Sequence, residues 1–125
     1  MGKKIIISSG DVRVEGVLFD TPTADALWNA LPLTANVNTW GDEIYFTVPV
    51  EVDLEDNAAE IVRNGDLGYW PSGPAFCIFF GPTPISKEGE IRPASAVNVF
   101  GRVAGDTSVL KIVSSGTDIT VQKAD

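Results

Sequence analysis

Hydrophobic and polar positions alternate over short stretches of this chain, a pattern that is typical of β-strands. Residues 5–8 form a β-branched run that ends at a Ser-Gly-Asp turn. Residues 12–18 follow, with Val12 and Val14 on one face and charged side chains between them. The two stretches predict a hairpin that buries one face against a core.

One amphipathic helix is predicted directly after this hairpin. Thr21 can cap its N-terminus, and Pro22 suits the first helical position, where no backbone N–H is needed. Apolar residues recur at helical spacing through residues 24–31 and predict a buried face that includes Trp28. Pro32 ends the helix, because the residue before a proline avoids the helical conformation.

The rest of the chain predicts further short strands and two weaker helices. The strands are expected at residues 34–39, 43–48, 67–70, 75–80, 97–103 and 119–121. The stretch 75–80 is apolar throughout, which indicates a strand buried on both faces. A capping box at Asn57–Glu60 predicts at most two helical turns before Asn64, and residues 108–113 predict another short helix.

Many short strands separated by turns indicate a closed barrel or a sandwich. A closed barrel leaves no unpaired edge on these apolar strands. We therefore expect a mainly β protein that forms one domain over residues 1–125. Its closed barrel should contain about eight strands, and the short helices should cap its two ends. No internal repeat or shift in composition marks a second domain.

The charge balance narrows the choice of partners. The chain has 125 residues, 17 acidic and 9 basic, and a formal net charge of −8. Nucleic acids and anionic membranes bind proteins largely through clustered lysine and arginine, so neither partner is expected. No apolar run is long enough for a spanning helix or for a signal peptide, and we expect a cytoplasmic location.

The absence of histidine and the single cysteine exclude several kinds of chemistry. Intramolecular disulfides, zinc sites of the usual ligands and imidazole-activated nucleophiles cannot form. An acidic stretch at residues 51–60 could hold Ca²⁺ or Mg²⁺, but it lacks the spacing of an EF-hand loop and is expected to be a solvated loop. We expect no metal and no cofactor. Cys77, inside an apolar run, is expected to be buried and unreactive.

The order of the predicted elements resembles that of cyclophilins. The most specific string, residues 97–105 (VNVFGRVAG), is similar to the cyclophilin segment Val-Val-Phe-Gly-Lys/Arg-Val-x-x-Gly, and Phe79-Phe80 is similar to a Phe-Phe pair of that family. The chain resembles still more closely a small bacterial and archaeal family of cyclophilin-like proteins of unknown function. That resemblance rests on residues 37–46 (VNTWGDEIYF), 65–71 (GDLGYWP), 79–84 (FFGPTP) and 92–99 (RPASAVNV).

The resemblance implies the cyclophilin barrel but not the cyclophilin activity. Prolyl isomerisation in that family uses an arginine on a strand after the first helix, and this chain has no Lys or Arg between Arg13 and Arg63. The family's histidine aligns with Val97, and residues 76–78 stand where the family has a glutamine. These departures predict that efficient prolyl isomerase activity is absent, and no catalytic residue is assigned.

Several aromatic and polar residues could instead line a ligand pocket. Aromatic walls with a few polar groups are typical of sites for small molecules or peptides. The alternative for most of these aromatic residues, the phenylalanines above all, is a place in the barrel core, and for Trp40 and Trp70 both the pocket and the core stay open. The candidate ligand-binding residues are Asn38, Trp40, Glu43, Tyr45, Tyr69, Trp70, Phe79, Pro84, Arg92, Ser95 and Asn98.

These observations predict a non-catalytic module that binds a small molecule or an extended peptide. Two alternatives stay open. One is an enzyme, either a weak prolyl isomerase or a carboxylate-based catalyst that uses Glu43 or Asp66 at a pKa raised by burial. The other is a subunit or scaffold whose apolar patch docks another chain, which would include a homo-oligomer.

Overall fold

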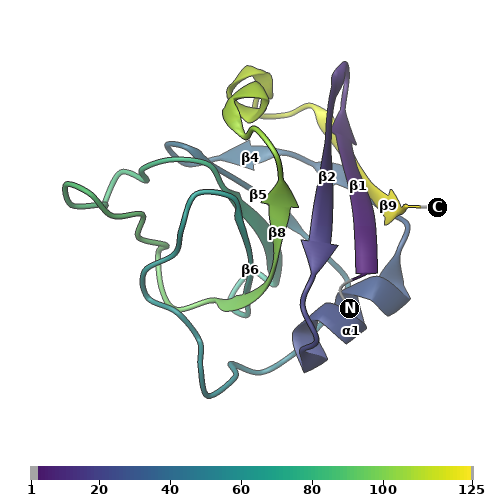
Figure 1. Cartoon of the computed structure of the whole chain (residues 1–125), viewed down its shortest axis with the longest axis horizontal. Helices are drawn as coiled ribbons and strands as arrows, with labels where there is room; N and C mark the ends of the chain where they lie inside the picture. The colour runs from purple at the N-terminus through teal and green to yellow at the C-terminus, as the bar shows by residue number, and fades with distance from the viewer. Residues whose placement is uncertain (1–2, 125) are drawn as a thin grey trace.

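The computed structural model describes residues 3–124, whose strands form one antiparallel sheet that curls into a nearly closed barrel (Figure 1). The strands are β1 (Lys3–Ser9), β2 (Val12–Leu18), β3 (Leu33–Asn36), β4 (Asn38–Thr39), β5 (Glu43–Thr47), β6 (Asp66–Trp70), β7 (Ala75–Phe79), β8 (Asn98–Ala104) and β9 (Asp118–Lys123). Their order in the sheet is β3-β9-β1-β2-β8-β6-β7-β5-β4. The predicted mainly β barrel is confirmed, with nine strands in the described residues where about eight were expected.

The predicted strand at residues 34–39 is two strands, and the break between them closes the barrel. β3 and β4 follow one another in sequence but lie at opposite edges of the sheet. Between them the side chain of Val37 is buried, and its backbone N–H donates to the Thr117 carbonyl at 2.9 Å. The Gly116 N–H donates to the Val37 carbonyl at 2.8 Å. Val37 therefore belongs to neither β3 nor β4, and at this residue the chain passes from one edge strand of the sheet to the other.

The N-terminal hairpin and the first helix agree with the sequence pattern. Val12 and Val14 of β2 are buried, and the charged residues between them are exposed. Helix α1 (Pro22–Ala30) is capped by the Thr21 hydroxyl, which accepts from the Ala24 N–H at 3.0 Å. This cap satisfies one of the backbone donors that the first helical turn leaves unpaired.

The second helix is a single 3₁₀ segment, η1 (Ser108–Ile112). It lies beside the tip of the β1–β2 hairpin, and α1 lies at the other end of that hairpin (Figure 1). The short helices thus occupy opposite ends of the barrel, as predicted. None of the helices in the described residues is long and apolar enough to cross a membrane.

Trp28 of α1 is only partly in the core, where the sequence predicted full burial. Its ring is half-buried and packs against the edge of the core. The ammonium groups of Lys3 and Lys123 lie 5.6 and 4.8 Å from the ring centroid. Cations at this range are attracted to the π-face, so the exposed side of the ring is covered by charge rather than by apolar packing.

The short helix predicted at Asn57–Asn64 is wrong. These residues form turns and two isolated bridges, in which Ala59 pairs with Val97 and Val62 with Ile91. The backbone N–H groups of Ala59 and Val62 donate to the Val97 and Ile91 carbonyls at 2.8 and 3.0 Å. Pairing with a distant segment thus outweighs the local preference for a helix.

Alternation along β5 and β7 separates the barrel core from a second apolar layer. Ile44, Phe46, Phe76 and Ile78 belong to the main core cluster inside the barrel. The Phe46 and Phe76 rings stack with centroids 4.9 Å apart. The intervening side chains point to the outer face of the sheet, because side chains alternate along a strand. The predicted burial of β7 on both faces is confirmed.

Candidate functional site

The outer face of β5, β6 and β7 is covered by two bridged segments, residues 59–62 and 91–97. Backbone bonds join them in both directions, from Ala59 N–H to the Val97 carbonyl at 2.8 Å and from Val97 N–H to the Ala59 carbonyl at 3.0 Å. Under this cover lies a small apolar cluster that is separate from the barrel core. Its buried members are Val62, Ala75, Cys77, Phe79 and Val97.

Gly68 of β6 lets the cover approach the sheet closely. A Cβ at this position would lie 2.9 Å from Val97 Cγ2 and 3.1 Å from Phe79 Cε2. Such contacts are shorter than van der Waals packing allows, so Val97 can occupy its place only because Gly68 has no side chain.

A pocket of about 200 Å³ lies beside this cluster, between the sheet and its cover. Two tryptophans, a tyrosine, a carboxyl and a thiol meet there with apolar residues of the cover. The lining residues are Trp40, Glu43, Tyr45, Trp70, Cys77, Pro93, Ala94 and Val97. Four of the predicted site residues, Trp40, Glu43, Tyr45 and Trp70, are thus brought together.

The β4–β5 hairpin places Trp40 beside Glu43. The Trp40 N–H donates to the Glu43 carbonyl at 2.9 Å, and the Glu43 N–H donates back at 3.2 Å. Gly41 has φ of +62° at the first central position of this turn, as a type II′ turn requires. The Asp42 N–H donates to the Pro82 carbonyl at 2.9 Å and ties the turn to the next loop. The predicted Gly-Asp turn is confirmed.

Trp70, at the end of β6, is held by the cover. Its indole N–H donates to the Ser95 hydroxyl at 2.6 Å. Ser95, another predicted site residue, does not line the pocket, but it restrains one of the pocket's aromatic walls. Trp40 and Trp70 are both half-buried, so each ring is available to a ligand in the pocket.

Glu43 is the one acidic side chain among the described residues that line the pocket. The residue is only 6% exposed. Burial raises the pKa of its carboxyl from 4.5 to about 7, and a hydrogen bond from the Cys77 thiol opposes this shift. No lysine or arginine is among the described residues that line the pocket. Near neutral pH, Glu43 therefore exchanges between a neutral acid and an uncompensated anion.

Cys77 is buried, as the apolar run predicted. Burial raises the pKa of its thiol well above the ordinary value, and the negative charge of Glu43 raises it further. The sulfur is thus a protonated hydrogen-bond donor in the pocket wall rather than a thiolate nucleophile.

Two of the predicted site residues serve the fold instead of this pocket. Tyr69 points into the barrel, where its hydroxyl donates to the Val50 carbonyl at 2.6 Å and accepts from the Val52 N–H at 3.1 Å. Asn98 is buried elsewhere in the structure. Its amide donates to the Thr23 hydroxyl at 3.0 Å and the Asp53 carbonyl at 2.9 Å, and it accepts from the Glu55 N–H at 2.8 Å.

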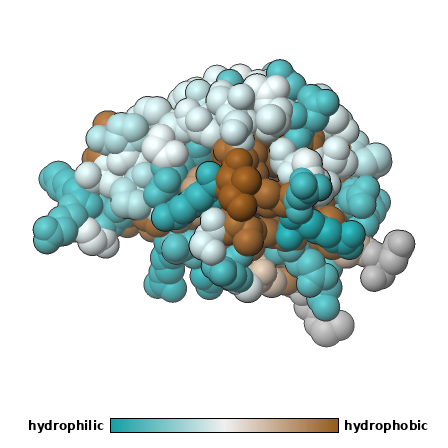
Figure 2. All heavy atoms as spheres, turned by 90° about the horizontal axis from the view of Figure 1, so that it is seen from above, coloured by the Kyte–Doolittle hydropathy of each residue, from teal (hydrophilic) through white to brown (hydrophobic). Residues whose placement is uncertain are grey.

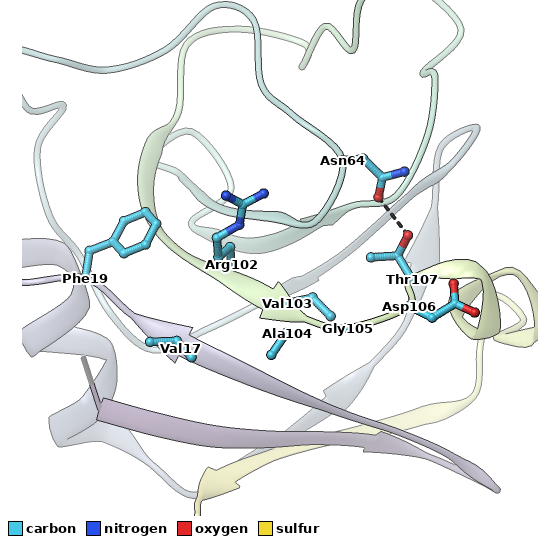
Figure 3. A pocket seen from close by; sticks show the side chains of 9 residues that line it. All are labelled: Val17, Phe19, Asn64, Arg102, Val103, Ala104, Gly105, Asp106 and Thr107. Atoms are coloured by element: carbon cyan, nitrogen blue, oxygen red, sulfur yellow. Dashed lines mark hydrogen bonds between the residues drawn. The ribbon is translucent and has the colours of Figure 1, made fainter. Parts of the chain in front are cut away.

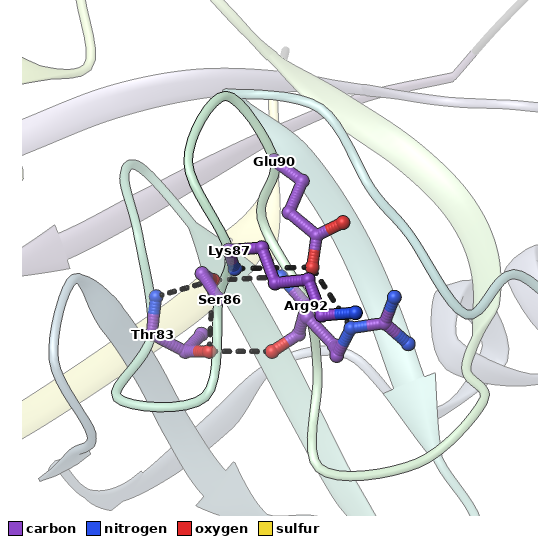
Figure 4. Close-up of polar contacts among 5 residues, drawn as sticks. All are labelled: Thr83, Ser86, Lys87, Glu90 and Arg92. Carbon is purple, nitrogen blue, oxygen red and sulfur yellow. Dashed lines mark hydrogen bonds and ion pairs between the residues drawn. The ribbon is translucent and has the colours of Figure 1, made fainter.

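The remaining predicted residues lie near the pocket without lining it. Asn38 is exposed on β4, Pro84 is exposed in the following loop, and Phe79 is fully buried in the cluster. Arg92 belongs to a hydrogen-bonded loop, and its Nε lies 2.9 Å from a Glu90 carboxylate oxygen (Figure 4). The Ser86 hydroxyl accepts from the Arg92 backbone N–H at 2.9 Å in the same loop.

Arg102 lies in a different groove, on the outer side of β8. This open groove of about 720 Å³ also contains Phe19, Asn64 and Thr107, and the Thr107 hydroxyl donates to the Asn64 amide oxygen at 2.7 Å (Figure 3). Neither Arg92 nor Arg102 lines the aromatic pocket. The pocket therefore receives no guanidinium from Arg92 or Arg102.

Two exposed apolar side chains of η1 lie together at one end of the barrel. Figure 2 views the molecule from this end and shows a hydrophobic patch on a mostly polar face. Val109 and Ile112 of η1 are 37% and 73% exposed and lie beside the tip of the β1–β2 hairpin.

In the acidic stretch at residues 51–60, Glu55 packs against the start of α1. A carboxylate oxygen of Glu55 accepts from the Thr23 backbone N–H at 3.1 Å and from the Thr23 hydroxyl. Within residues 3–124 no three acidic or cysteine side chains are grouped so that they could hold a metal ion. The second candidate carboxylate, Asp66, accepts from the Arg63 backbone N–H at 2.8 Å and closes the turn before β6.

Four pocket residues were missed by the sequence interpretation: Cys77, Pro93, Ala94 and Val97. Two signals could have found part of this set. Strand alternation places Cys77 on the face opposite Phe76, and antiparallel pairing then sets it against Tyr45. Val97 aligns with the cyclophilin histidine, which marks it as a position near that family's site.

Comparisons with known proteins agree with the fold. A model of the family described as cyclophilin-like matches residues 3–122. The solution structure of a hypothetical protein from Archaeoglobus fulgidus superposes with a TM-score of 0.84 at 43% sequence identity, and the match covers 98% of this chain and 95% of that one. No curated protein matches the sequence.

Proposed function

Because the chain belongs to the cyclophilin-like family, we propose that it is a binding module that takes its ligand on the outer face of the barrel. The ligand is a small molecule or one side chain of an extended peptide, held between Trp40, Tyr45 and Trp70. Val97, which aligns with the cyclophilin histidine, lies in the wall of this pocket. By this alignment the pocket corresponds to the isomerase site of cyclophilins, but its described lining contains Val97 in place of that family's histidine and no arginine.

The burial of Glu43 is the observation that carries this proposal. Burying a carboxyl among apolar groups costs stability unless a charged partner compensates it. The barrel core does not need this carboxyl, because Glu43 faces away from the main cluster. A strongly shifted acid inside a cavity is a common mark of a functional site.

The dimensions and walls of the pocket support a compact ligand. Pockets that bury drug-sized molecules have volumes of roughly 300–1,000 Å³. The volume here is about 200 Å³, and four of the eight lining residues are aromatic or proline. The pocket thus suits one small molecule or one side chain rather than a long stretch of peptide.

An NMR titration of the ¹⁵N-labelled protein tests the proposal. Trp40 and Trp70 line the pocket, so their indole N–H signals report on it, whereas Trp28 lies on α1 outside the pocket and serves as an internal control. We expect members of a library of small metabolites and short peptides to shift the signals of Trp40 and Trp70 while the signal of Trp28 stays in place.

Two substitutions sharpen this test. Trp40→Ala removes an aromatic wall and should weaken binding at least tenfold. Phe19→Ala, in the open groove, should leave binding unchanged. A library without any compound that moves Trp40 or Trp70, or binding that Phe19→Ala weakens as much as Trp40→Ala, would contradict the proposal.

The pKa of Glu43 favours a carboxylate-based enzyme as the second candidate. A general acid or base works best with a pKa near the working pH, and the pKa of Glu43 is about 7. Bound compounds from the titration should therefore be followed by NMR for several hours. Conversion that requires Glu43 and is lost in Glu43→Gln supports an enzyme, whereas compounds that bind and stay intact support a binding module.

A further inference from the structure

The lining of the aromatic pocket indicates the charge of its ligand. Of its eight lining residues, Glu43 is the one with an ionised form at neutral pH, and that form is negative. The others are aromatic or apolar, apart from the protonated Cys77 thiol. An anionic ligand would meet like charge with no described lysine or arginine in the wall to offset it.

A neutral apolar ligand also fits poorly. It would remove the remaining water from Glu43 and offer the carboxyl no hydrogen-bond or charge partner, which costs free energy. A hydrated inorganic cation meets the opposite problem, because aromatic walls cannot replace its oxygen ligands. Both the walls and the carboxyl are satisfied by a positive charge with apolar surroundings.

Alkylated ammonium groups have this combination. Their charge is spread over methyl or methylene groups that pack against aromatic rings, and the ring quadrupoles attract the cation. A carboxylate beside the rings adds a counter-ion in a region where burial strengthens the attraction. The net charge of −8 further favours the approach of cations at low ionic strength.

We infer, on the basis of the proposed binding function, that the pocket takes a compact alkylated ammonium group, with Glu43 as its counter-ion and Trp40, Tyr45 and Trp70 as its aromatic walls. The ammonium group belongs to a small metabolite or to a modified side chain of a peptide. The pocket volume of about 200 Å³ limits the group to a few methyl or methylene substituents.

The inference couples binding to the ionisation of Glu43. The titratable groups around this carboxyl are Tyr45 on the same strand and Cys77 on β7, while β6 and the cover contribute Trp70 and apolar residues. With a pKa of about 7, Glu43 is about one-tenth ionised at pH 6 and nine-tenths ionised at pH 8. If the anion is the binding form, the apparent affinity should rise about tenfold over this range.

A pair of isosteres tests the inference. Choline carries a trimethylammonium group, and 3,3-dimethylbutan-1-ol carries a tert-butyl group of nearly the same shape without the charge. We expect choline to shift the indole signals of Trp40 and Trp70 and to bind at least tenfold more tightly than the alcohol at pH 8. Its affinity should fall about tenfold between pH 8 and pH 6.

Matched variants separate the local charge from the overall charge. Glu43→Gln should abolish the preference for choline and its pH dependence. Glu15→Gln, which changes the net charge equally at an exposed position on β2, should leave both unchanged. The tryptophan signals and a thermal melt of each variant establish that it is folded.

The remaining outcomes overturn the inference. Equal binding of the two isosteres, or a preference for choline that persists in Glu43→Gln, refutes the ammonium assignment. If neither isostere moves Trp40 or Trp70, the ammonium inference is wrong, and the library titration still decides the proposed binding function independently. An equal loss of choline binding in Glu15→Gln would assign the attraction to overall charge.

Discussion

Glu43 and Cys77 lie on adjacent strands with their side chains on the same outer face of the sheet, where the Cys77 thiol favours the charged form of the Glu43 carboxyl. The register of β5 and β7 produces this contact, because Tyr45 pairs with Cys77 and Phe79 pairs with Glu43. The two groups shift each other's pKa, so either can be used to probe the other.

Glu43→Gln should stabilise the protein increasingly as the pH rises. The folded state holds the Glu43 proton up to about pH 7, and the unfolded state releases it near pH 4.5. Between these values the wild-type unfolding free energy falls by about 1.4 kcal/mol per pH unit from this group, or about 3 kcal/mol in total. Urea denaturation from pH 4.5 to 7.5 should show the variant gaining stability over the wild type. Glu15→Gln should give a flat difference, and a flat difference for Glu43→Gln would refute the raised pKa.

Cys77→Ala should raise the pKa of Glu43 above its value of about 7. The thiol hydrogen bond favours the charged carboxylate, and alanine removes this donor. The ¹³C shift of the Glu43 side-chain carboxyl, followed from pH 5 to pH 9, measures the change. Cys77→Ser keeps a donor and should shift the pKa less. A lower pKa in the alanine variant would contradict the hydrogen bond.

The native Cys77 thiol should react slowly with Ellman's reagent at pH 8. The sulfur is buried, which limits access of the reagent to it. The pKa of the thiol is raised well above the ordinary value, so little of it is in the reactive thiolate form. Labelling should accelerate steeply across the urea unfolding transition. Stoichiometric labelling of the native protein within seconds would show that the pocket wall opens readily.

Gly68→Ala should destabilise the fold by about 1–3 kcal/mol through overpacking. The new Cβ would meet Val97 Cγ2 at 2.9 Å and the Phe79 ring at 3.1 Å, both inside the covered cluster. Gly16→Ala is the comparison, because its Cβ would meet mainly the Ile5 side chain at 3.1 Å, which can adjust. Urea midpoints should fall further for Gly68→Ala. Equal midpoints would indicate that the cover yields without cost.

Asn98→Ala should cost about 1–3 kcal/mol of unfolding free energy. Its amide joins Thr23 in α1 to the backbone of residues 53–55, and alanine leaves these partners unsatisfied. Asn36→Ala removes one exposed hydrogen bond to Asp118 and should cost far less. If both variants unfold at the same urea concentration, the Asn98 network contributes nothing to stability.

The protein should leave the rate of prolyl isomerisation in a protease-coupled assay at its uncatalysed value. Rotation about the X–Pro bond is slow, and the cyclophilin resemblance assigns its acceleration to an arginine beside the amide. The described lining of the aromatic pocket contains a carboxyl and no guanidinium. A rate that rises with protein concentration and falls in Trp40→Ala would overturn this expectation.

The strand pattern narrowed the fold to a barrel or a sandwich, the cyclophilin resemblance favoured the barrel, and capping and turn residues predicted α1 and the Gly41 turn. These features depend on local signals: alternation, a capped helix start and a glycine with positive φ. The break at Val37 and the extended path of residues 57–64 depend on distant partners, Thr117 in one case and Val97 in the other. No local signal encodes them, so the sequence predicted one long strand and a short helix instead.

The candidate site was predictable to a similar degree. Trp40 and Trp70 adjoin turn residues, which predicted strand ends but left pocket and core equally open, and the structure places both in the pocket wall. Tyr69 and Asn98 are residue types that also occur in binding sites, so the sequence did not distinguish them from pocket residues. The strand register points Tyr69 into the barrel, and the Asn98 amide is buried and hydrogen-bonded to Thr23 of α1. The raised pKa of Glu43 depends on the cover formed by Pro93 and Val97, a tertiary arrangement that no spacing in the sequence specifies.

Because the pocket lies on the outer side of β5 and β7, its chemistry can vary independently of the barrel. Glu43, Tyr45 and Cys77 face the pocket, while the neighbouring residues Ile44, Phe46 and Phe76 belong to the core. Each of these two strands thus carries two separable sets of residues, one facing the pocket and one facing the core. A protein engineer could exchange acid for base at position 43 and redirect selectivity toward anions, leaving the scaffold's folding determinants intact.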